Sequence, residues 1–543
     1  MTTETVRPLH DFPPSYWGDR FVTYTCDSKK IEDYTKQVEV LKKEVRKMLI
    51  DDSITLSQKM NLINEVLRLG VGYYFETEIK EGLQQLYSEV NDFDDLYTAS
   101  LHFRLLRQHG YNASCDVFKK FKDDNGSFTS SLVTDIPGML SLYEATHLRT
   151  YGEDILEEAL AFTTDHLKSI VATQSSHPLK KQVEYALKQP YHKGTPRLEA
   201  KNYISFSEEH EERNETLLKL AKLDFIVMRS IYLKELSDVT VWWRNLSSEL
   251  PYVRDRVTEI YFWLLGMNFE PRYSVARIIS MKVGCFISIL DDTYDAYGTV
   301  EELQLLTDAI ERLIACSTFF PHLLEHLKTT YYIFLNSFGF QEIEDECTKE
   351  GRSYRIPYAK GAMKDLVKAY LTEAKWCNQS YVPTIEEYLR VASVTGATTI
   401  LTNASILGMG DNFTKEAFDW VSSEPLMINA ANRLFRVTDD IRGHKYDQQR
   451  MHVASAVECY VEEYGVSEAE AYQELTKMTE TAWKDLNQEL ILSPAGPPMH
   501  VLERVLNCIR IVEVIYKNIH GYTHAEIEFK DHIHLLLIDP INI

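Results

Sequence analysis

Glycine and proline are scarce in this sequence, with 22 and 17 residues respectively among 543. Folds that depend on glycine-rich nucleotide loops or on many tight β-turns need more of both residues, so the composition argues against such folds. Basic residues are also in the minority, with 58 Lys and Arg against 81 Asp and Glu and a net charge of −23. A surface that acidic repels phosphate backbones and anionic lipid headgroups, so we do not expect nucleic acid as a partner.

Other features are missing as well. No apolar run reaches the roughly 18 residues that predict a membrane span. The opening segment, MTTETVRPLHDFPPSYWGD, lacks the apolar core of a signal peptide and does not have the composition of a transit peptide. The eight cysteines lie far apart without a CxxC pair, which excludes a zinc ribbon and fits reduced thiols. We therefore expect a cytoplasmic protein without a membrane span.

Apolar and aromatic side chains at helical spacing are abundant. The hydrophobic share is 44%, with 32 Tyr, 23 Phe and 7 Trp, which is enough for a large packed interior. In the segment VEELQLLTDAIERLIA, which begins at Val300, apolar residues return every three or four positions. We found no alternating strand pattern and no solenoid repeat. The sequence predicts an all-α protein, and its length fits two domains divided near residue 220.

Three aspartates follow the apolar stretch VGCFISIL. Asp291 and Asp295 are four residues apart, which places both carboxylates on one face of a helix with Asp292 close beside them. Like charges at this spacing repel each other unless a hard divalent cation bridges them. Magnesium suits two carboxylates together with phosphate oxygens and water, so the pattern predicts a magnesium site. The alternative is an acidic helix end that faces solvent.

A second acidic array follows about 150 residues later. Asp439, Gly443 and Asp447 recur at intervals of four and share one helical face. Two helices with such faces can clamp several magnesium ions around one diphosphate. Without the first array, the preferred interpretation is an amphipathic helix with a mixed charged surface.

Two arginines lie at the start of an apolar, aromatic helix that contains YFWLLG. Guanidinium groups hold phosphate oxygens through paired hydrogen bonds and keep their charge, which makes Arg254 and Arg256 candidates for contact with a phosphate group. Trp263 lies seven residues after Arg256, on the same side of the helix, and an indole face stabilises a nearby positive charge. The alternative for Trp263 is an ordinary core position.

The string Asp92-Phe93-Asp94-Asp95 matches the DxDD pattern of an aspartic acid that protonates alkenes. Short acidic strings also arise by chance in so acidic a chain. The surrounding segment, VNDFDDLYTAS, is typical of a helix start, where carboxylates lie at the positive end of the helix dipole. We therefore predict that these aspartates cap a helix.

Together these segments resemble the plant class I terpene synthases, specifically the cytosolic sesquiterpene synthases, and the resemblance covers almost the whole chain. The segments that carry it are Arg7-Pro8, FPPSYWGD from Phe12, FRLLRQHGYNASCDVF from Phe103, TPRLEA from Thr195, RDRVTEIYFW from Arg254, LDDTYDAYGT from Leu290, AYLTEAKW from Ala369, LGMGD from Leu407, the Asp439 array and GYTH from Gly521. The DxDD string lies off the register of the family's protonating motif.

The resemblance implies an all-α fold with two domains. A catalytically silent N-terminal α-barrel is expected at 1–218, with an N-terminal segment that caps the active site, and a catalytic helical bundle at 219–543. Three Mg²⁺ ions are implied as cofactor, with Mn²⁺ as a substitute. The implied metal ligands are Asp291 and Asp295 of the DDxxD motif, and Asp439 and Asp447 of the second metal motif.

The resemblance also implies roles for other side chains. The departing diphosphate is received by Arg254, Arg256 and Arg436, and aromatic walls are supplied by Trp263 and Tyr522. Thr395 and Gly396 mark a break in the opposite helix. The substrate is expected to contact Arg254, Asp291, Asp295, Thr395, Gly396, Arg436 and Asp439.

Three positions depart from the family pattern. Gly443 lacks the hydroxyl that many relatives use as a metal ligand, and a water is expected in its place. Asp447 replaces the usual Glu. His520 replaces the aspartate of the usual DGYTH string. This replacement argues against a proton-transfer role that depends on that aspartate.

We therefore expect a magnesium-dependent lyase that ionises farnesyl diphosphate and releases diphosphate and a sesquiterpene hydrocarbon or alcohol. One alternative is a monoterpene synthase that uses geranyl diphosphate, which the absent plastid peptide and tandem-arginine N-terminus argue against. A second is prenyl chain elongation, which normally needs two DDxxD motifs. A non-catalytic helical scaffold is the alternative from another class. A monomer is expected, with a homodimer as the alternative.

Overall fold

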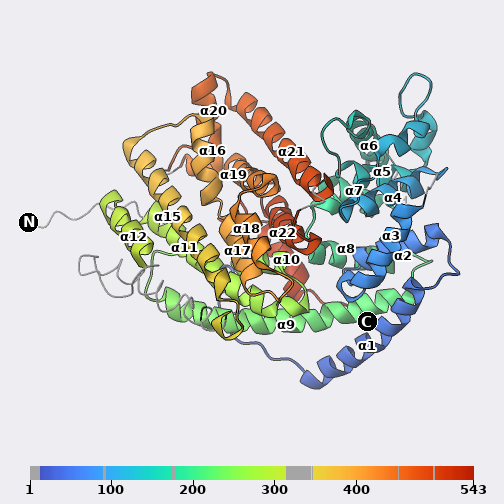
Figure 1. Cartoon of the computed structure of the whole chain (residues 1–543), viewed down its shortest axis with the longest axis horizontal. Helices are drawn as coiled ribbons and strands as arrows, with labels where there is room; N and C mark the ends of the chain where they lie inside the picture. The colour runs from blue at the N-terminus through green and yellow to red at the C-terminus, as the bar shows by residue number, and fades with distance from the viewer. Residues whose placement is uncertain are drawn as a thin grey trace, which may run out of the picture. The chain divides into compact units, whose positions relative to one another are not determined.

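The computed structural model describes residues 13–89, 93–173, 178–313, 344, 347–449, 452–492 and 496–543. Throughout this part the regular structure is helical (Figure 1), and the only pairing of extended residues within it is an isolated bridge between Lys122 and Phe128. The all-α prediction is confirmed. Arg7, Pro8, Phe12 and Asp92, which the sequence analysis singled out, lie outside the described residues.

The described residues form two compact units. The N-terminal unit contains Thr25–Ile231, Lys484–Met499 and His534–Ile543, and the C-terminal unit contains residues 13–24, Tyr232–Trp483 and His500–Ile533. The division falls inside one continuous helix, α9 (Glu215–Ser247), so no turn or linker marks it in the sequence. The predicted boundary at 218/219 lies near the start of the same helix and stays a prediction.

The N-terminal unit packs its helices around aromatic side chains. Its helices are α1 (Ser28–Leu49), α2 (Leu56–Arg68), α3 (Glu76–Ser88), α4 (Leu96–Gln108), α5 (Ile136–Thr146), α6 (Asp154–Thr173), α7 (Lys180–Lys188) and α8 (Pro196–Glu208), with short turns η1 (Gly72–Tyr74), η2 (Cys115–Phe121), η3 (Ser130–Thr134) and η4 (Tyr191–Lys193). Phe103, Phe118 and Phe128 share one buried cluster between α4, α5 and α6. Burial of apolar side chains is the main favourable contribution to folding, and rings of this size supply much buried area.

The described part of the DxDD string, residues 93–95, lies at the start of α4. Asp95 is the N-cap of this helix, and its carboxylate accepts a hydrogen bond from the Thr98 amide at 2.7 Å. This side chain satisfies an amide that the first turn of a helix leaves without a partner. The capping prediction is confirmed for Asp95, while Asp94 is exposed.

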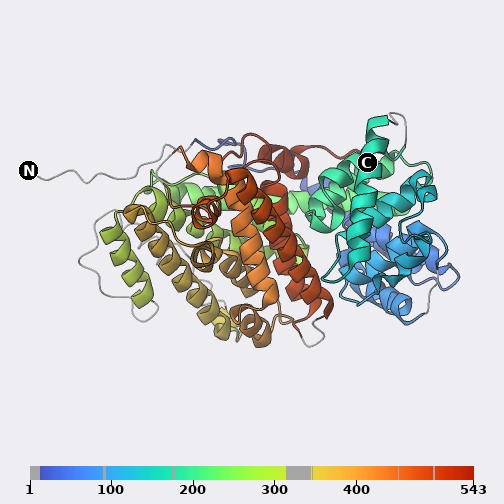
Figure 2. The same ribbon diagram turned by 90° about the horizontal axis from the view of Figure 1, so that it is seen from above.

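The C-terminal unit contains the remaining helices (Figure 2). They are α10 (Val257–Met267), α11 (Ser274–Ala296), α12 (Val300–Leu313), α15 (Ile356–Gln379), α16 (Ile385–Thr395), α17 (Thr398–Leu407), α18 (Lys415–Ser422), α19 (Leu426–Asp447), α20 (Ala456–Tyr464), the first part of α21 (Glu468–Leu492), α22 (Met499–Ile515) and α23 (Phe529–Ile533), with short turns η5 (Pro271–Tyr273) and η7 (Ser353–Arg355). A π-turn, η8 (His534–Ile538), follows α23 in the sequence and belongs to the N-terminal unit.

Helix α11 lies in the interior of the C-terminal unit. The segment Pro271–Ala296 is long and apolar enough to cross a membrane, but 72% of its most apolar window is buried inside the protein. It packs against α10, α15 and α17. A helix with neighbours on several sides is apolar over most of its circumference, so its composition fits a core position. The first acidic array occupies its C-terminal end.

Buried ion pairs fix the start of α11. The Arg277 guanidinium pairs with Glu235 of α9 at 2.7 Å and donates to the backbone carbonyls of Asn268 and Glu270, both at 2.7 Å. Arg504 of α22 pairs with the Glu270 carboxylate at 2.9 Å. Because these charges are buried, removing one partner would leave the other without compensation, which is strongly destabilising. The network therefore fixes α11 relative to α9 and α22.

The cysteines form no cross-links in the described part of the chain. Seven of them, all except Cys316, lie there, and none of these seven forms a disulfide. This agrees with the prediction of reduced cysteines, and Cys316 lies outside the described residues.

Candidate active site

A cavity of about 570 Å³ lies within the C-terminal unit. Its wall is formed by residues of α10, α11, α12, α15, α16, α17 and α19, of the segment before α20 and of the segment that follows α22. A volume of this size is typical of small-molecule sites in proteins. Both acidic arrays of the sequence line this cavity, so residues about 150 positions apart in the chain meet at one site.

Helix α11 supplies the first acidic face. Asp291 and Asp295 line the cavity, and the Asp291 side chain is 33% exposed. Asp292 is fully buried, and both of its oxygens contact Arg254, one the guanidinium at 2.6 Å and the other the backbone amide at 2.7 Å. Burial raises the pKa of Asp292 to about 6, against the opposing effect of Arg254. Asp292 therefore anchors Arg254, whose guanidinium also pairs with Asp291.

Helix α19 supplies the second acidic face, which also carries an arginine. Arg436 pairs with Asp439 and donates to Asp440 at 2.8 Å. Asp440 is buried and accepts two further hydrogen bonds, from the Tyr388 hydroxyl at 2.8 Å and the Ala456 amide at 2.9 Å. Each face therefore has one buried carboxylate that holds an arginine, beside less buried carboxylates that also line the cavity.

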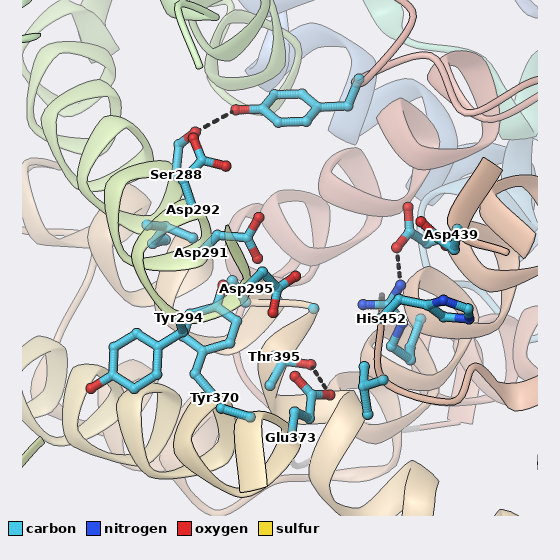
Figure 3. Close-up of a pocket in the computed structure, with 18 of the residues that line it drawn as sticks. Ser288, Asp291, Asp292, Tyr294, Asp295, Tyr370, Glu373, Thr395, Asp439 and His452 are labelled. Atoms are coloured by element: carbon cyan, nitrogen blue, oxygen red, sulfur yellow. Dashed lines mark hydrogen bonds and ion pairs between the residues drawn. The ribbon is translucent and has the colours of Figure 1, made fainter. Parts of the chain in front are cut away.

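The two acidic faces lie on opposite sides of the cavity. Figure 3 shows Asp291 and Asp295 on one side and Asp439 on the other. In the described part of the chain, no three Asp, Glu, His or Cys side chains lie close enough to hold a metal ion by themselves. Magnesium commonly uses one or two carboxylates and completes its octahedral shell with water and phosphate oxygens. The carboxylates present therefore fit magnesium shared with a bound phosphate compound and do not fit a closed protein cage.

Arg256 lies apart from these groups. Its guanidinium donates hydrogen bonds to backbone carbonyls of Pro13, Tyr522 and Thr523 at 3.2 to 3.3 Å, and its side chain is buried outside the cavity wall. Trp17 donates to the buried carboxylate of Glu259 at 2.9 Å. Arg256 thus joins the N-terminal residues to the segment that carries Tyr522, and the structure does not bring it to the cavity with Arg254.

Aromatic side chains form the apolar part of the wall. Trp263 is almost fully buried, and its ring lies 5.3 Å from Phe435 and 6.3 Å from Tyr516, centroid to centroid. Tyr522 donates its hydroxyl proton to Ser288 at 2.9 Å, and its ring lies 5.3 Å from the Arg254 guanidinium carbon. The predicted pocket residues Trp263 and Tyr522 therefore meet in one cavity, and Phe435 and Tyr516 complete the wall.

The predicted helix break also lies at the cavity. Helix α16 ends at Thr395 and α17 begins at Thr398, and Thr395 and Gly396 both line the cavity. Ala397 has a φ of 60°, a conformation that costs free energy for a residue with a Cβ atom. The break turns the chain there, so that backbone as well as side chains face the cavity.

Sequence reasoning missed Glu373 of α15. This carboxylate lines the cavity, is almost fully buried, and accepts a hydrogen bond from the Thr395 hydroxyl at 2.9 Å (Figure 3). Burial raises its pKa to about 8. The residue lies within the segment AYLTEAKW, which carries the family resemblance, and an acid among apolar residues there was the available signal.

The chain matches two family models. Residues 16–187 match "Terpene synthase, N-terminal domain", and residues 244–485 match "Terpene synthase family, metal binding domain". A (−)-germacrene D synthase from Vitis vinifera is 50% identical over 548 residues, which span 100% of this chain and 97% of that protein. Sesquiterpene synthase 2 from Toona sinensis is 48% identical over 545 residues, which span 98% of this chain and 96% of that protein. 

A solved structure has a similar fold. It is the isoprene synthase from grey poplar leaves (Populus x canescens), in complex with three Mg²⁺ ions and dimethylallyl-S-thiolodiphosphate. The TM-score is 0.85 at 32% sequence identity, and the match covers 94% of this chain and 97% of that one.

Proposed function

We propose, from the premise that this chain belongs to the terpene synthase family, that it converts farnesyl diphosphate into a sesquiterpene and releases diphosphate. The chain is a sesquiterpene synthase, a lyase with the metal-binding domain of that family. The observation that supports the proposed reaction best is the pair of acidic helix faces, each with its own arginine, across one cavity with aromatic walls.

We propose Mg²⁺ as the cofactor, with three ions and with Mn²⁺ as a substitute. Asp291 and Asp295 would hold metal on one side of the cavity, and Asp439 and Asp447 on the other. When bound, the metal ions neutralise the charge that develops on the diphosphate leaving group. The grey poplar enzyme, which was solved with three Mg²⁺ ions and a diphosphate analogue, supports this number of ions.

The arginines act on the same leaving group. Arg254 and Arg436 are fixed by Asp292 and Asp440 respectively, so their charge is in place before the substrate arrives. A fixed charge stabilises a developing anion without the cost of reorganising water. Arg256 is a positioning residue in this proposal, because its donors hold the backbone at Tyr522 and Thr523.

The aromatic wall acts on the hydrocarbon. Ionisation leaves a carbocation, and the faces of Trp263, Phe435 and Tyr516 stabilise positive charge without offering it a nucleophile. When the site closes around the substrate, the apolar part of the wall also keeps water from the cation until the final deprotonation or water capture. Thr395 and Gly396 lie at the helix break and would contact the substrate chain.

We also propose that 219–543 is the catalytic domain, that 1–218 is catalytically silent, and that the N-terminal segment caps the active site. Contacts of Arg256 with the Pro13 carbonyl and of Trp17 with Glu259 support the capping role. The cytoplasmic location and the monomeric state stay predictions.

The direct test is product analysis by gas chromatography with mass spectrometry. Purified protein with Mg²⁺ is expected to form sesquiterpenes from farnesyl diphosphate and to lose this activity when the metal is chelated. Geranyl diphosphate is assayed in parallel at the same concentration. Turnover of geranyl diphosphate alone would identify a monoterpene synthase, and no turnover of either substrate would favour a non-catalytic scaffold.

Trp263→Ala is expected to change the product mixture and to slow turnover, because it removes a ring that lines the cavity beside Phe435 and Tyr516. Product ratios from farnesyl diphosphate are the measurement. Trp376→Ala is the matched control, since Trp376 is also buried but does not itself line the cavity. It should lower thermal stability and keep the wild-type product ratios. An unchanged mixture in Trp263→Ala would favour the core interpretation of that residue.

Asp94→Ala is expected to retain wild-type turnover and wild-type stability, because Asp94 is exposed in the N-terminal unit. Asp95→Ala provides the contrast: it removes the cap of α4 and should cost about 1 kcal/mol of unfolding free energy. Urea unfolding and turnover are measured for both variants. Loss of turnover in a folded Asp94→Ala protein would show that the DxDD string takes part in catalysis.

A further inference from the structure

An imidazole lies against the second acidic face. His520, in the segment after α22, has its Nε2 atom 2.9 Å from Oδ1 of Asp439. The Nδ1 atom of the same ring accepts a hydrogen bond from the Thr523 amide at 3.2 Å. Because Nδ1 is an acceptor, the ring proton belongs on Nε2, which is the nitrogen that faces the carboxylate.

Gly443 leaves the space that this ring occupies. A Cβ atom at position 443 would lie 3.1 Å from Cδ2 of His520 and 2.9 Å from Oδ2 of Asp447. Both distances are shorter than ordinary van der Waals contact, so a side chain at 443 would push against the imidazole and the carboxylate. Gly443 lies inside α19 without a positive φ, so close approach, and not backbone conformation, explains the glycine.

The ring is also held from another side. Tyr516, which is buried in the cavity wall, packs edge to face against His520 with 5.1 Å between ring centroids. The His520 side chain is only 15% exposed. The second oxygen of Asp439 contacts Arg436, so both oxygens of this carboxylate have a neighbour within the chain. These contacts fix the orientation of the imidazole, and the imidazole in turn limits the rotation of Asp439.

We propose that His520 is a positioning residue for Asp439, and that Gly443 is the partner that makes room for it. The two departures from the family pattern, Gly443 and His520, then form one structural unit. The imidazole ring of His520 fills space that a side chain at position 443 would otherwise occupy. The inference rests on the proposed function only in taking Asp439 as a metal ligand. Magnesium prefers oxygen, so the imidazole orients the ligand and does not bind the ion.

The test measures binding of Mg²⁺ with inorganic pyrophosphate by calorimetry on the full chain. His520→Ala is expected to weaken this binding by about 10-fold or more, the range found when the group that orients a metal ligand is removed. His520→Gln restores an N–H group near the place of Nε2 and should recover most of the affinity. Asn518→Ala, an exposed side chain in the same segment that contacts Glu528, is the matched control and should bind as wild type.

A double-mutant cycle tests the partnership with Gly443. Gly443→Ser should weaken binding of Mg²⁺ and pyrophosphate more strongly when His520 is present than in the His520→Ala background, where only the contact with Asp447 remains. Melting temperatures without metal show whether each variant is folded. Equal effects of Gly443→Ser in both backgrounds would overturn the partnership, and wild-type affinity in His520→Ala would overturn the positioning role.

The proposed function is tested separately by wild-type turnover of farnesyl diphosphate. A wild-type protein that binds Mg²⁺ and pyrophosphate with the expected coupling, yet forms no sesquiterpene, would overturn the proposed reaction alone. A wild-type protein that forms sesquiterpenes while His520→Ala binds the probe normally would overturn this inference alone.

Discussion

Asp291→Ala is expected to abolish turnover of farnesyl diphosphate while the protein stays folded. Asp291 lines the cavity with a side chain that is 33% exposed, and it is a proposed metal ligand. Its loss leaves Arg254 with Asp292 as an ion-pair partner at 2.6 Å, so no buried charge is left uncompensated. It also relieves repulsion from Asp295. A partly exposed ion pair contributes at most about 1 kcal/mol, so the melting temperature should change little.

The neighbouring residue gives the contrast for this prediction. Asp292 is fully buried and holds both the guanidinium and the backbone amide of Arg254. Asp292→Ala should therefore cost about 3–5 kcal/mol of unfolding free energy, as expected when one partner of a buried ion pair is removed. Asp291→Ala is therefore expected to cost catalysis with little stability, whereas Asp292→Ala is expected to cost stability as well, because it also releases Arg254.

Turnover, melting temperature and Mg²⁺ dependence are measured for both variants. Product formation by Asp291→Ala with a wild-type response to Mg²⁺ would contradict the assignment of Asp291 as a metal ligand. A melting temperature that falls as far in Asp291→Ala as in Asp292→Ala would mean that the lost activity reflects unfolding.

The local parts of this site could be predicted from the sequence because helical spacing determines them. Asp291 and Asp295 lie one turn apart in α11 and both line the cavity, as the period of 3.6 residues requires. The same period turns Asp292 away from them, and the structure buries it against Arg254. Proximity in sequence had suggested only that Asp292 lies close beside the other two.

The long-range parts could not be predicted in this way. Position 520 is far from 439 in the sequence, and no periodic pattern joins a residue after α22 to a face of α19. The departures at 443 and 520 are visible in the sequence as two separate changes, but their contact depends on how the segment after α22 packs against α19. Arg256 shows the converse: its spacing from Arg254 suggested a shared role, while the structure directs its donors to backbone carbonyls.

Arg436→Ala is expected to lower the rate of ionisation by about 10²- to 10³-fold, the effect of losing one preorganised group that stabilises developing charge. The guanidinium contacts Asp439 and Asp440 of its own helix, so its position is fixed by two carboxylates. Single-turnover measurements with farnesyl diphosphate isolate this step from product release. The variant also leaves Asp440 buried, with only the Tyr388 hydroxyl and the Ala456 amide as partners, so some loss of stability is expected.

A second variant separates these two effects. Arg436→Lys keeps a positive charge near Asp440 but lacks the planar fork that can contact two groups at once. It should recover most of the stability that Arg436→Ala loses and only part of the rate. If the charge of Arg436 served only to neutralise Asp440, lysine would restore both the stability and the rate. Full recovery of rate and stability in Arg436→Lys would therefore assign Arg436 to the fold alone, whereas a stable but slow lysine variant requires the guanidinium at the leaving group.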